Sequence, residues 1–321
     1  MEDGVAGRPV TGLPPPRPER AALRLAQYNV QALAYFRSSA GAASATAAGI
    51  CDLLLGTQSD VVILQEFTEA EQQAWPLDPE REPLAHGLAQ RLAAAGFAHQ
   101  HLALGQIYPT FVASRLPLAP APLPAASQHA LSSSCTALRL RVCTAGGRAV
   151  EVLACHLDFQ IARKRLEEAR ALLACALPVD AQAAPPAVLL AADFNQPRAC
   201  DYTAEEWGWI MAWRAEHGEG ASDGVDELLQ GAGFACAYDA EGAGRNWPAG
   251  APPPPTHWSG MSIDRAYSKG LACCGVYIHP SALSDHHPVI TDWRWAEGGG
   301  EGKAAPPGVK GYCGACSAEG E

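Results

Sequence analysis

The sequence predicts one α/β domain built on two mixed β-sheets, and three observations support this. Short β-type runs alternate with helical patterns along most of the chain, and its 321 residues suffice for a sizeable core. Two of the runs, VVIL and VLLAA, are continuously apolar, as in strands that are buried on both faces. The arginine-bearing runs between residues 110 and 157 resemble a meander, which argues against a single doubly wound sheet.

Eight runs have the composition and length of β-strands. Several of them alternate apolar with polar side chains, which is the pattern of a strand with one buried face. The runs cover residues 23–30, 60–67, 110–118, 135–142, 149–157, 187–195, 262–268 and 288–295.

Four segments between these runs are predicted to be helices. Each places apolar residues three or four positions apart and has glycine or proline near its end. The segments cover residues 44–55, 82–96, 161–177 and 204–218. Residues 239–262, in contrast, form a long irregular stretch directly before a strand, and loops of this length in compact domains are usually functional or disordered.

The two ends of the chain differ in composition from the part between them. Residues 1–20 contain TGLPPPRPER, a proline-rich segment that we expect to be disordered and solvated. Residues 296–321 are rich in Gly, Ala and Glu and are expected to form a flexible tail. Residues 21–295 show no linker or internal repeat and are predicted to fold as one domain.

The chain is acidic, with a formal net charge of −11. Residues 1–20 carry three acids and three bases, and residues 296–321 carry four acids and two bases, so the core holds −9. Such a surface gives no general attraction to nucleic acid or anionic lipid. A polyanionic substrate would therefore bind at a local patch or through a metal ion.

The cysteines and the N-terminal sequence indicate an intracellular protein. Eleven cysteines are present, an odd number, and Cys143, Cys155, Cys175 and Cys236 lie in apolar stretches as small buried residues would. A disulfide framework is therefore not expected. The start, MEDGVAGRPV, has no apolar signal region, and no later stretch has 18 uninterrupted apolar residues. We expect a soluble protein of the cytoplasm or nucleus, with no membrane insertion and no protein partner.

Polar side chains with catalytic potential follow the apolar strands at their ends, where a rigid scaffold holds functional groups. They lie in the motifs QYNV, ILQE, CHLD, ADFN, SIDR and SDHH. Four of the carboxylates have no lysine among them and would repel one another if they converged. A hard divalent cation would relieve this repulsion, and Mg²⁺ binds a few carboxylates while keeping several waters.

In this order, the motifs resemble those of the endonuclease/exonuclease/phosphatase superfamily over residues 23–295. The resemblance implies a four-layer αββα sandwich of two mixed sheets flanked by helices, with the site at the rim where the sheets meet. It also implies a metal-dependent hydrolase that cleaves a phosphodiester or phosphomonoester bond by in-line attack of water. Residues 21–295 would then be the catalytic domain.

The resemblance also implies three metal-binding residues. Glu66 matches the family's principal metal-binding glutamate, and Asn29 matches the asparagine that supports metal and phosphate on the first strand. Asp285 matches the terminal aspartate of the family. The expected cofactor is Mg²⁺, with Mn²⁺ as an alternative.

Five further residues match the family's catalytic positions. Asp193 and Asn195 match the residues that orient the attacking water and hold the phosphate, and His156 resembles a histidine that contacts a phosphate oxygen. His286 matches the terminal histidine, and Asp264 matches its aspartate partner. In-line displacement places negative charge on the phosphate oxygens, which these amide and imidazole donors would stabilise. A carboxylate bonded to His286 would fix its tautomer and raise its pKa.

The substrate is expected to be a phosphate ester, either nucleic acid or a small phosphorylated molecule. Arg163, His257 and Trp258 are predicted to contact it, the last two because they lie in the long loop just before Asp264. Other bases could join Arg163 in a phosphate-binding rim, namely Lys164, Arg165, Arg198, Arg265 and Lys269.

Two other classes of function stay open from the sequence. The first is a binding or scaffold protein that keeps the fold without catalysis, although such a protein has no need of mutually repelling carboxylates. The second is a zinc-dependent interaction module that uses Cys313 and Cys316 of the tail, although a lone C-x-x-C pair supplies only half of a structural zinc site.

The neighbouring histidines of SDHHPVITDW are predicted to differ in role. Adjacent side chains of an extended segment point to opposite faces. His286 follows Asp285 at the catalytic position, whereas His287 precedes the proline that enters the strand. We therefore predict a phosphate donor at His286 and a structural role for His287.

Overall fold

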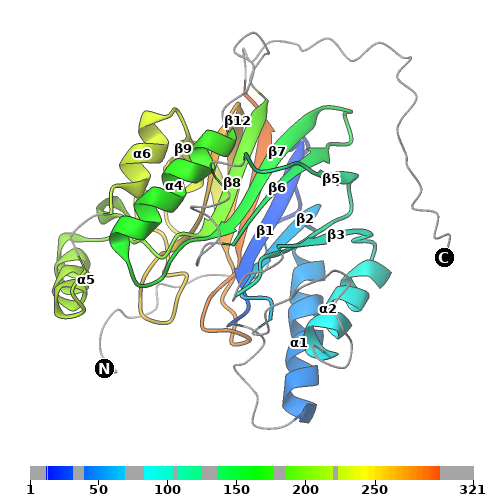
Figure 1. Ribbon diagram of the computed structural model, residues 1–321, viewed down its shortest axis with the longest axis horizontal. Helices are drawn as coiled ribbons and strands as arrows, with labels where there is room; N and C mark the ends of the chain where they lie inside the picture. Colours follow the sequence, from blue (N-terminus) through cyan, green and yellow to red (C-terminus); the bar gives the residue numbers. More distant parts are fainter. Residues whose placement is uncertain are drawn as a thin grey trace.

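The computed structural model describes residues 12, 14–31, 40–68, 83–103, 108–124, 127, 136–176, 186–219 and 223–296, with the side chains of 40–45 left aside. Two β-sheets pack face to face, and helices cover the outer face of each (Figure 1). The predicted four-layer sandwich of two mixed sheets is confirmed. The proposed boundaries of the domain stay a prediction, and the tail pair Cys313 and Cys316 lies outside the described residues.

The first sheet has seven strands and is mixed. Its order is β10 (Gly244–Arg245), β12 (Leu271–Ile278), β13 (Val289–Trp295), β1 (Leu23–Asn29), β2 (Val61–Gln65), β4 (Phe111–Ser114) and β3 (His99–Leu102). β1 pairs parallel to β2 and antiparallel to β13. Helices α1 (Ala40–Gly56) and α2 (Pro83–Ala94) cover its outer face (Figure 1).

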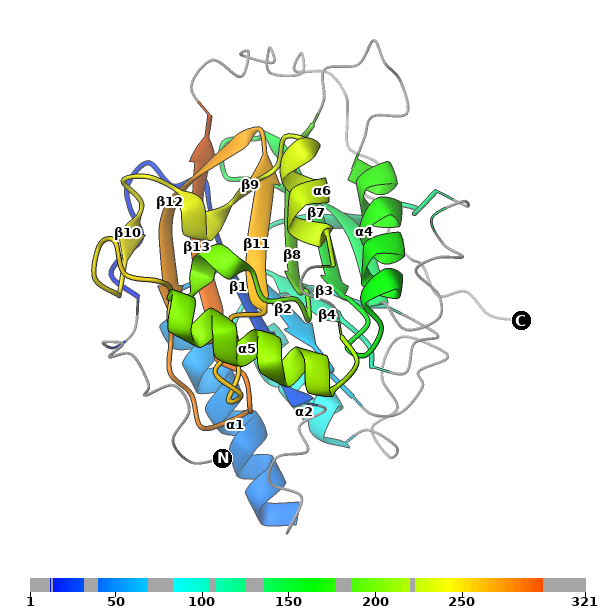
Figure 2. The same ribbon diagram turned by 90° about the vertical axis from the view of Figure 1, so that its left-hand side faces the viewer.

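The second sheet has six strands. Its order is β5 (Leu118–Pro120), β6 (Thr136–Cys143), β7 (Ala149–His156), β8 (Ala187–Asp193), β11 (Asp264–Lys269) and β9 (Ala235–Cys236). Helices α4 (Ala162–Ala176) and α6 (Val225–Gly231) lie on its outer side, and α5 (Ala204–Glu216) packs nearer to the rim (Figures 1 and 2). β5, β6 and β7 form the predicted meander, while β7 and β8 run parallel.

Alternation along β1 decides which side chains face the second sheet. Leu23 and Leu25 belong to the core between the sheets, whereas Ala26 and Tyr28 pack under the helices. The same alternation places Asn29, the last residue of the strand, on the inner face. The alternation thus places Asn29 at the inner edge of the sandwich, beyond the apolar core that Leu23 and Leu25 help to form.

The predicted strand 110–118 is two strands, because the chain changes sheets within it. β4 belongs to the seven-stranded sheet and β5 to the six-stranded sheet. In the turn between them, Ser114 Oγ accepts from the backbone N–H of Leu116 at 3.0 Å and donates to its carbonyl at 2.8 Å. The prediction of a single strand over residues 110–118 is therefore wrong, because the chain passes from one sheet to the other within this run.

β12 was not predicted from the sequence. Its first residues, Leu-Ala-Cys-Cys-Gly, neither alternate nor carry β-branched side chains, and the register shifts between Cys273 and Gly275. β12 nevertheless lies between β10 and β13, and the β11–β12 hairpin crosses from one sheet to the other (Figure 2). This crossing closes the sandwich along one side.

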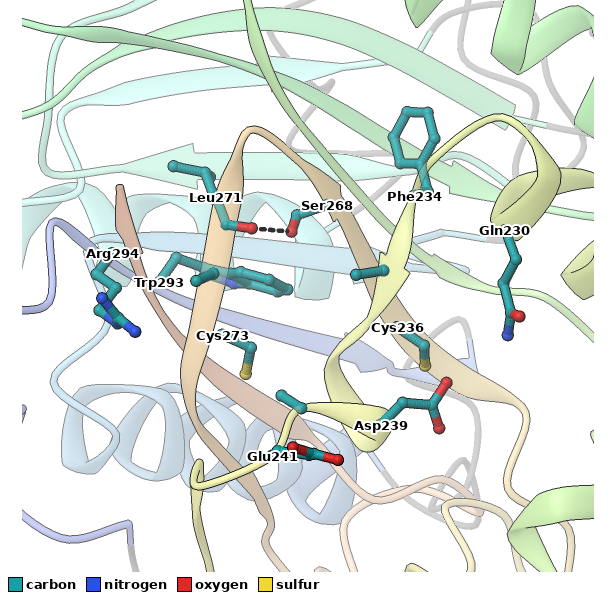
Figure 3. A pocket seen from close by; sticks show the side chains of 13 residues that line it. Gln230, Phe234, Cys236, Asp239, Glu241, Ser268, Leu271, Cys273, Trp293 and Arg294 are labelled. Carbon is teal, nitrogen blue, oxygen red and sulfur yellow. Dashed lines mark hydrogen bonds between the residues drawn. The ribbon is translucent and has the colours of Figure 1, made fainter. Parts of the chain in front are cut away.

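A cavity of about 520 Å³ lies along this closed side, between β9, β12 and β13 (Figure 3). Trp293 and the thiols of Cys236 and Cys273 line it. Burial raises the pKa of Cys236 to about 12 and raises that of Cys273 as well, so both stay protonated thiols. Among the described cysteines Cys155, Cys175 and Cys236 are buried as predicted, but Cys143 is exposed, because it ends an edge-proximal strand at a turn.

No described helix has both the length and the apolar composition needed to cross a bilayer.

A buried ion pair joins the first and last strands of the domain. Arg24 Nε and Nη2 donate to the two carboxylate oxygens of Asp292 at 2.7 and 2.8 Å, and both side chains are fully buried. The guanidinium also donates to the carbonyls of Thr57 and Pro15. The pair is therefore part of a hydrogen-bonded network that holds β1 against β13.

Replacing Asp292 with alanine is expected to lower the free energy of unfolding by about 3–5 kcal/mol, because the charge of Arg24 would stay buried without its partner. Chemical denaturation measures this change. Glu167→Ala removes the exposed partner of Arg163 and serves as the control, with an expected loss below about 0.5 kcal/mol. A loss below about 1 kcal/mol for Asp292→Ala would contradict the prediction.

Candidate active site

Three site residues form a row across the end of the six-stranded sheet. In the strand register Asp193 is paired with His156 of β7 on one side and with Asp264 of β11 on the other. Paired residues of neighbouring strands carry their side chains on the same face. The sheet register therefore brings together three residues that the sequence places 37 and 71 positions apart, and all three are buried.

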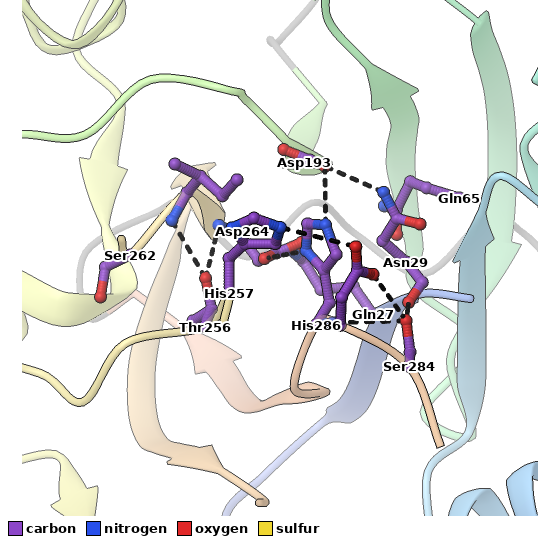
Figure 4. Close-up of polar contacts among 12 residues, drawn as sticks. Gln27, Asn29, Gln65, Asp193, Thr256, His257, Ser262, Asp264, Ser284 and His286 are labelled. Carbon is purple, nitrogen blue, oxygen red and sulfur yellow. Dashed lines mark hydrogen bonds and ion pairs between the residues drawn. The ribbon is translucent and has the colours of Figure 1, made fainter. Parts of the chain in front are cut away.

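Asn29 links this row to the seven-stranded sheet. Its Nδ2 donates to Asp193 Oδ2 at 3.0 Å (Figure 4). The same Nδ2 donates to Glu66 Oε1, also at 3.0 Å. Its Oδ1 accepts from the backbone N–H of Gln31 at 3.0 Å, which fixes the orientation of the amide. One asparagine thus holds a carboxylate from each sheet at the rim where the sheets meet.

Glu66 follows β2 directly and Asn195 lies two residues after the end of β8, and both have a φ of 49°, in the left-handed region. This conformation is uncommon for glutamate, and residues held in it cluster at functional sites. Glu66 is the more accessible of the two carboxylates beside Asn29, since its side chain is 21% exposed and that of Asp193 is 1% exposed. An ion from solvent can reach Glu66.

Asn195 and His156 lie against each other. Asn195 Nδ2 donates to the carbonyl of Leu157 and is 3.0 Å from His156 Nε2. Its backbone N–H donates to Asp193 Oδ1 at 2.9 Å. His156 Nε2 is also 3.6 Å from Asp193 Oδ2 and 3.8 Å from Glu66 Oε1. The ring therefore lies between the carboxylates of the two sheets.

His286 and Asp264 form the predicted pair. His286 Nδ1 is 2.8 Å from Asp264 Oδ2, and His286 Nε2 is 3.8 Å from Asp193 Oδ2 (Figure 4). Burial works against a charged imidazole, but the negative charges of Asp264 and Asp193 outweigh it and raise the pKa of His286 to about 10. His286 is therefore an imidazolium at neutral pH, with Nε2 as its free donor.

Asp193 is ionised in this setting. Burial alone would raise its pKa, but the charges of His286 and His156 and hydrogen bonds from Asn29 and Asn195 lower it below the ordinary value. The pKa of Asp264 is raised by burial, which exceeds the opposing effect of the His286 charge. The two aspartates on either side of His286 thus differ, and Asp193 is the stronger acid.

Asp285 lies in a neighbouring cluster with His257. Its Oδ2 accepts from Gln31 Nε2 at 2.8 Å and is 3.6 Å from His257 Nε2, and the rings of His257 and His286 have centroids 4.6 Å apart. Burial would raise the pKa of Asp285, but the hydrogen bond with His257 and the charge of His286 lower it. The side chain of Asp285 therefore contacts Gln31, Ser284 and the histidines, whereas that of Glu66 contacts Asn29 and His156.

Backbone hydrogen bonds fasten the long loop to the segment that carries the histidines. His287 N–H donates to the carbonyl of Thr256 at 2.7 Å, and Trp258 N–H donates to the carbonyl of Asp285 at 2.8 Å. Thr256 Oγ1 accepts from the backbone N–H groups of Ile263 and Asp264. The loop therefore holds His257 and Trp258 beside the site.

The His287 ring bonds to a turn and not to a catalytic side chain. Its Nδ1 accepts from the backbone N–H of Ser281 at 3.2 Å. Burial and then the charge of His286 lower the pKa of His287, so it is neutral at neutral pH. The two adjacent imidazoles thus have opposite protonation states and different neighbours.

Several polar residues contact the site although the sequence analysis did not select them. Gln31 and Thr256 are described above, and Ser284 Oγ donates to the carbonyl of Asn29 at 2.8 Å. In the sequence, only their positions next to Asn29, His257 and Asp285 indicate that they lie at the site. Because Gln, Thr and Ser are common in turns, that signal was weak.

The predicted basic rim is wrong for three of its members. Arg165, Arg198 and Arg265 are buried and paired with carboxylates, because each anchors a loop or helix behind the six-stranded sheet. Arg163, in contrast, is 86% exposed and only loosely paired with Glu167, at 3.7 Å. Asp158 shapes a turn, since its Oδ1 accepts from the backbone N–H groups of Gln160 and Ile161.

The carboxylate and amide oxygens at the rim are suitable ligands for a hard divalent cation. Within the part of the chain that the structure describes, the ion pairs of Glu66, Asp193, Asp264 and Asp285 involve histidines and no lysine or arginine. Asp264 Oδ1 and Gln65 Oε1 are buried without a hydrogen bond there. At the rim, two sets of residues bring ligand atoms within 4.8 Å of one another, namely His257, Asp285 and His286, and Asp193, Asp264 and His286. Carboxylate and amide oxygens are the ligands that Mg²⁺ and Mn²⁺ prefer.

Solved structures with the same fold come from several sources. An endonuclease/exonuclease/phosphatase from Beutenbergia cavernae is 19% identical, with a TM-score of 0.58 over 86% of this chain and 72% of that one. The human Nocturnin catalytic domain with bound sulfate is 15% identical, with a TM-score of 0.57 over 87% and 96%. ANGEL2, a 2′,3′-cyclic phosphatase, in complex with adenosine-2′,3′-vanadate is 14% identical, with a TM-score of 0.59 over 91% and 99%.

The sequence is similar to a protein family rather than to a single curated protein. No curated protein matches it. The model of the Endonuclease/Exonuclease/phosphatase family matches residues 26–286, which span the rim from β1 to His286. Members of this family are hydrolases of phosphoesters and generally depend on divalent metal ions. The chain belongs to the endonuclease/exonuclease/phosphatase family.

Proposed function

We propose that this protein is a Mg²⁺-dependent phosphoesterase that cleaves a phosphodiester or phosphomonoester bond by in-line attack of water, with Mn²⁺ as an alternative ion. One observation carries the proposal. Asn29 bridges Glu66 and Asp193 from the two sheets, beside an imidazolium at His286 whose free donor faces the same carboxylate. Anionic and cationic groups thus converge where a phosphate and a metal ion would have to meet.

Glu66, Asn29 and Asp285 are proposed to hold the metal ion. A bound divalent cation would stabilise the negative charge that develops on the phosphate oxygens. Three observations favour Glu66 as the principal ligand: its partial exposure, its left-handed backbone and its lack of a cationic partner other than histidine among the described residues. Asp285, beside His257, is proposed as the second acidic ligand.

Asp193 is proposed to take a proton from the attacking water. Its lowered pKa keeps it ionised, and hydrogen bonds from Asn29 and the backbone of Asn195 hold both of its oxygens in place. A carboxylate that is ionised and fixed in orientation can position the water for attack as well as accept its proton. The Asn195 amide, beside His156, is proposed to hold the phosphate.

His286 and His156 are proposed to donate hydrogen bonds to the phosphate. The hydrogen bond of His286 Nδ1 to Asp264 leaves Nε2 as the free donor of the imidazolium. A charged donor such as His286 acts most strongly where water is excluded, and both rings are buried. Asp264 is thus proposed as the residue that positions His286.

Arg163, His257 and Trp258 are proposed to contact the substrate, which is a nucleic acid or a small phosphorylated molecule. His257 lies beside His286, and Trp258 follows it in the chain. ANGEL2 is a 2′,3′-cyclic phosphatase with the same fold, so nucleotide esters are the first substrates to test.

The direct test of this function is hydrolysis by protein that has been freed of metal with a chelator. We expect no release of p-nitrophenol from bis(p-nitrophenyl) phosphate until Mg²⁺ or Mn²⁺ is added, and recovery of at least about a hundredfold in rate. p-Nitrophenyl phosphate, assayed in parallel, distinguishes a diesterase from a monoesterase. Equal hydrolysis with and without metal would contradict the proposal.

A further inference from the structure

Large apolar side chains on the surface gather at the candidate site. Among the described residues three are exposed, namely Trp258 (73%), Phe159 (52%) and Ile161 (50%). Phe159 and Ile161 lie in the turn that follows His156 at the end of β7, and Trp258 follows His257. Single exposed apolar residues scattered over a surface need no explanation, but their concentration on two loops of one site indicates a binding surface.

The backbone of both loops is held in place. Trp258 N–H donates to the carbonyl of Asp285 at 2.8 Å, and Gly260 N–H donates to the carbonyl of His257 at 3.0 Å. On the other loop, Asp158 Oδ1 accepts from the N–H of Ile161 at 2.7 Å. The exposed side chains are therefore displayed on fixed turns, which lowers the entropic cost of binding.

From these loops we infer that the Trp258 indole and the Phe159–Ile161 turn form a stacking rim for unpaired nucleobases, so that the substrate is a single-stranded nucleic acid. The inference rests on the proposed function, since it places the bases beside the phosphate that the site would cleave. Aromatic side chains stack on every base, whereas the bases of a duplex are already stacked on one another.

The charges near the rim favour a nucleic acid strand over a membrane surface. Arg163 lies two residues after Ile161 and is 86% exposed, while the ammonium of Lys164 is paired with Asp158 at 3.2 Å. The core carries −9, which opposes binding to anionic lipid and confines attraction for a polyanion to such local bases. Basic side chains that alternate with aromatic side chains are typical of proteins that bind single-stranded nucleic acid.

Binding of fluorescein-labelled oligomers tests this inference separately from catalysis. A twelve-residue oligothymidylate is compared with an abasic oligomer of the same length, which has the same phosphates and no bases, on metal-free protein by fluorescence anisotropy. Wild-type protein is expected to bind the thymidylate about 10-fold more tightly or better. Trp258→Ala should weaken thymidylate binding about 5- to 100-fold and leave abasic binding unchanged, while Trp258→Phe should restore most of it.

Phe159→Ala is expected to weaken thymidylate binding by a smaller factor, because a phenyl ring offers less stacking area than an indole. Equal binding of both oligomers by wild-type protein would overturn the stacking rim. Equal weakening of both by Trp258→Ala would do the same, since it would indicate a general disturbance of the site. A third outcome would replace the inference by lipid docking. In it, wild-type protein binds the two oligomers equally and binds neutral phosphatidylcholine vesicles, and Trp258→Ala abolishes the vesicle binding.

The two proposals fail separately. Metal-dependent hydrolysis of bis(p-nitrophenyl) phosphate without base-dependent binding would leave the phosphoesterase standing and remove the nucleic acid substrate. Base-dependent binding without hydrolysis of any ester would remove the phosphoesterase and leave a single-strand binding surface.

Discussion

Replacing Asp193 with asparagine is expected to lower kcat/KM for bis(p-nitrophenyl) phosphate about a thousandfold. The amide keeps the shape of the carboxylate but cannot accept a proton from water, and general-base catalysis contributes about 10²–10⁴ in rate. It also removes one of the negative charges that hold His286 protonated. Steady-state kinetics with saturating Mg²⁺ measures the loss.

The control for this substitution is Asp52→Asn, which changes an exposed carboxylate on α1, outside the rim. It should leave kcat/KM within about twofold of wild type. Because Asp193 is buried, thermal unfolding of the variant must be recorded as well. A folded Asp193→Asn protein with less than a tenfold loss would show that another group takes the proton.

Replacing His286 with alanine is expected to lower kcat about 10²–10³-fold, whereas His287→Ala should cost less than about fivefold. Loss of one preorganised donor to a developing oxyanion has an effect of this size. His287 is neutral and accepts from the backbone of Ser281, so its removal loosens a turn rather than the site. The hydrolysis assay measures kcat for both variants, so the two neighbouring histidines are compared under the same conditions. Equal losses would mean that both imidazoles serve the phosphate.

The pH profile supplies a second check on His286. Its folded pKa of about 10 lies above the ordinary value of 6.5, so the donor is protonated at neutral pH and is lost as pH rises through about 10. We expect kcat/KM to stay constant from neutral to mildly alkaline pH and to fall at higher pH. His286→Gln, which donates without titrating, should retain part of the activity and lack that decline. A decline centred near pH 7 in wild-type protein would contradict the assignment.

Much of the fold follows from short sequence patterns, because strand alternation and helix periodicity are local. The predicted runs 23–30, 149–157 and 187–195 are strands, which end at Asn29, His156 and Asp193, and these polar last residues meet at one rim. Sheet register, in contrast, is a long-range property. Only the structure shows that His156, Asp193 and Asp264 pair in one row.

The parts that sequence reasoning missed depend on tertiary contacts. An arginine among the charged residues of a predicted helix is expected to be solvated, yet Arg165 in α4 is buried against Asp223, 58 residues away. β12 lacks a strand pattern and is a strand because both neighbours supply hydrogen bonds. The pairing of Asp285 with Gln31 spans 254 residues and has no local signature. The intracellular location and the absence of a protein partner stay predictions.

The central claim is that the rim holds a divalent metal ion through Glu66 and uses it for hydrolysis, and a paired titration tests it most directly. Binding of Mn²⁺ is followed by calorimetry, and hydrolysis of bis(p-nitrophenyl) phosphate is followed over the same Mn²⁺ concentrations, for wild-type protein and Glu66→Gln. We predict that activity rises with site occupancy in wild-type protein, and that Glu66→Gln weakens binding at least about tenfold and shifts both curves together. Unchanged Mn²⁺ binding in Glu66→Gln, or hydrolysis by wild-type protein that does not follow occupancy, would contradict the claim.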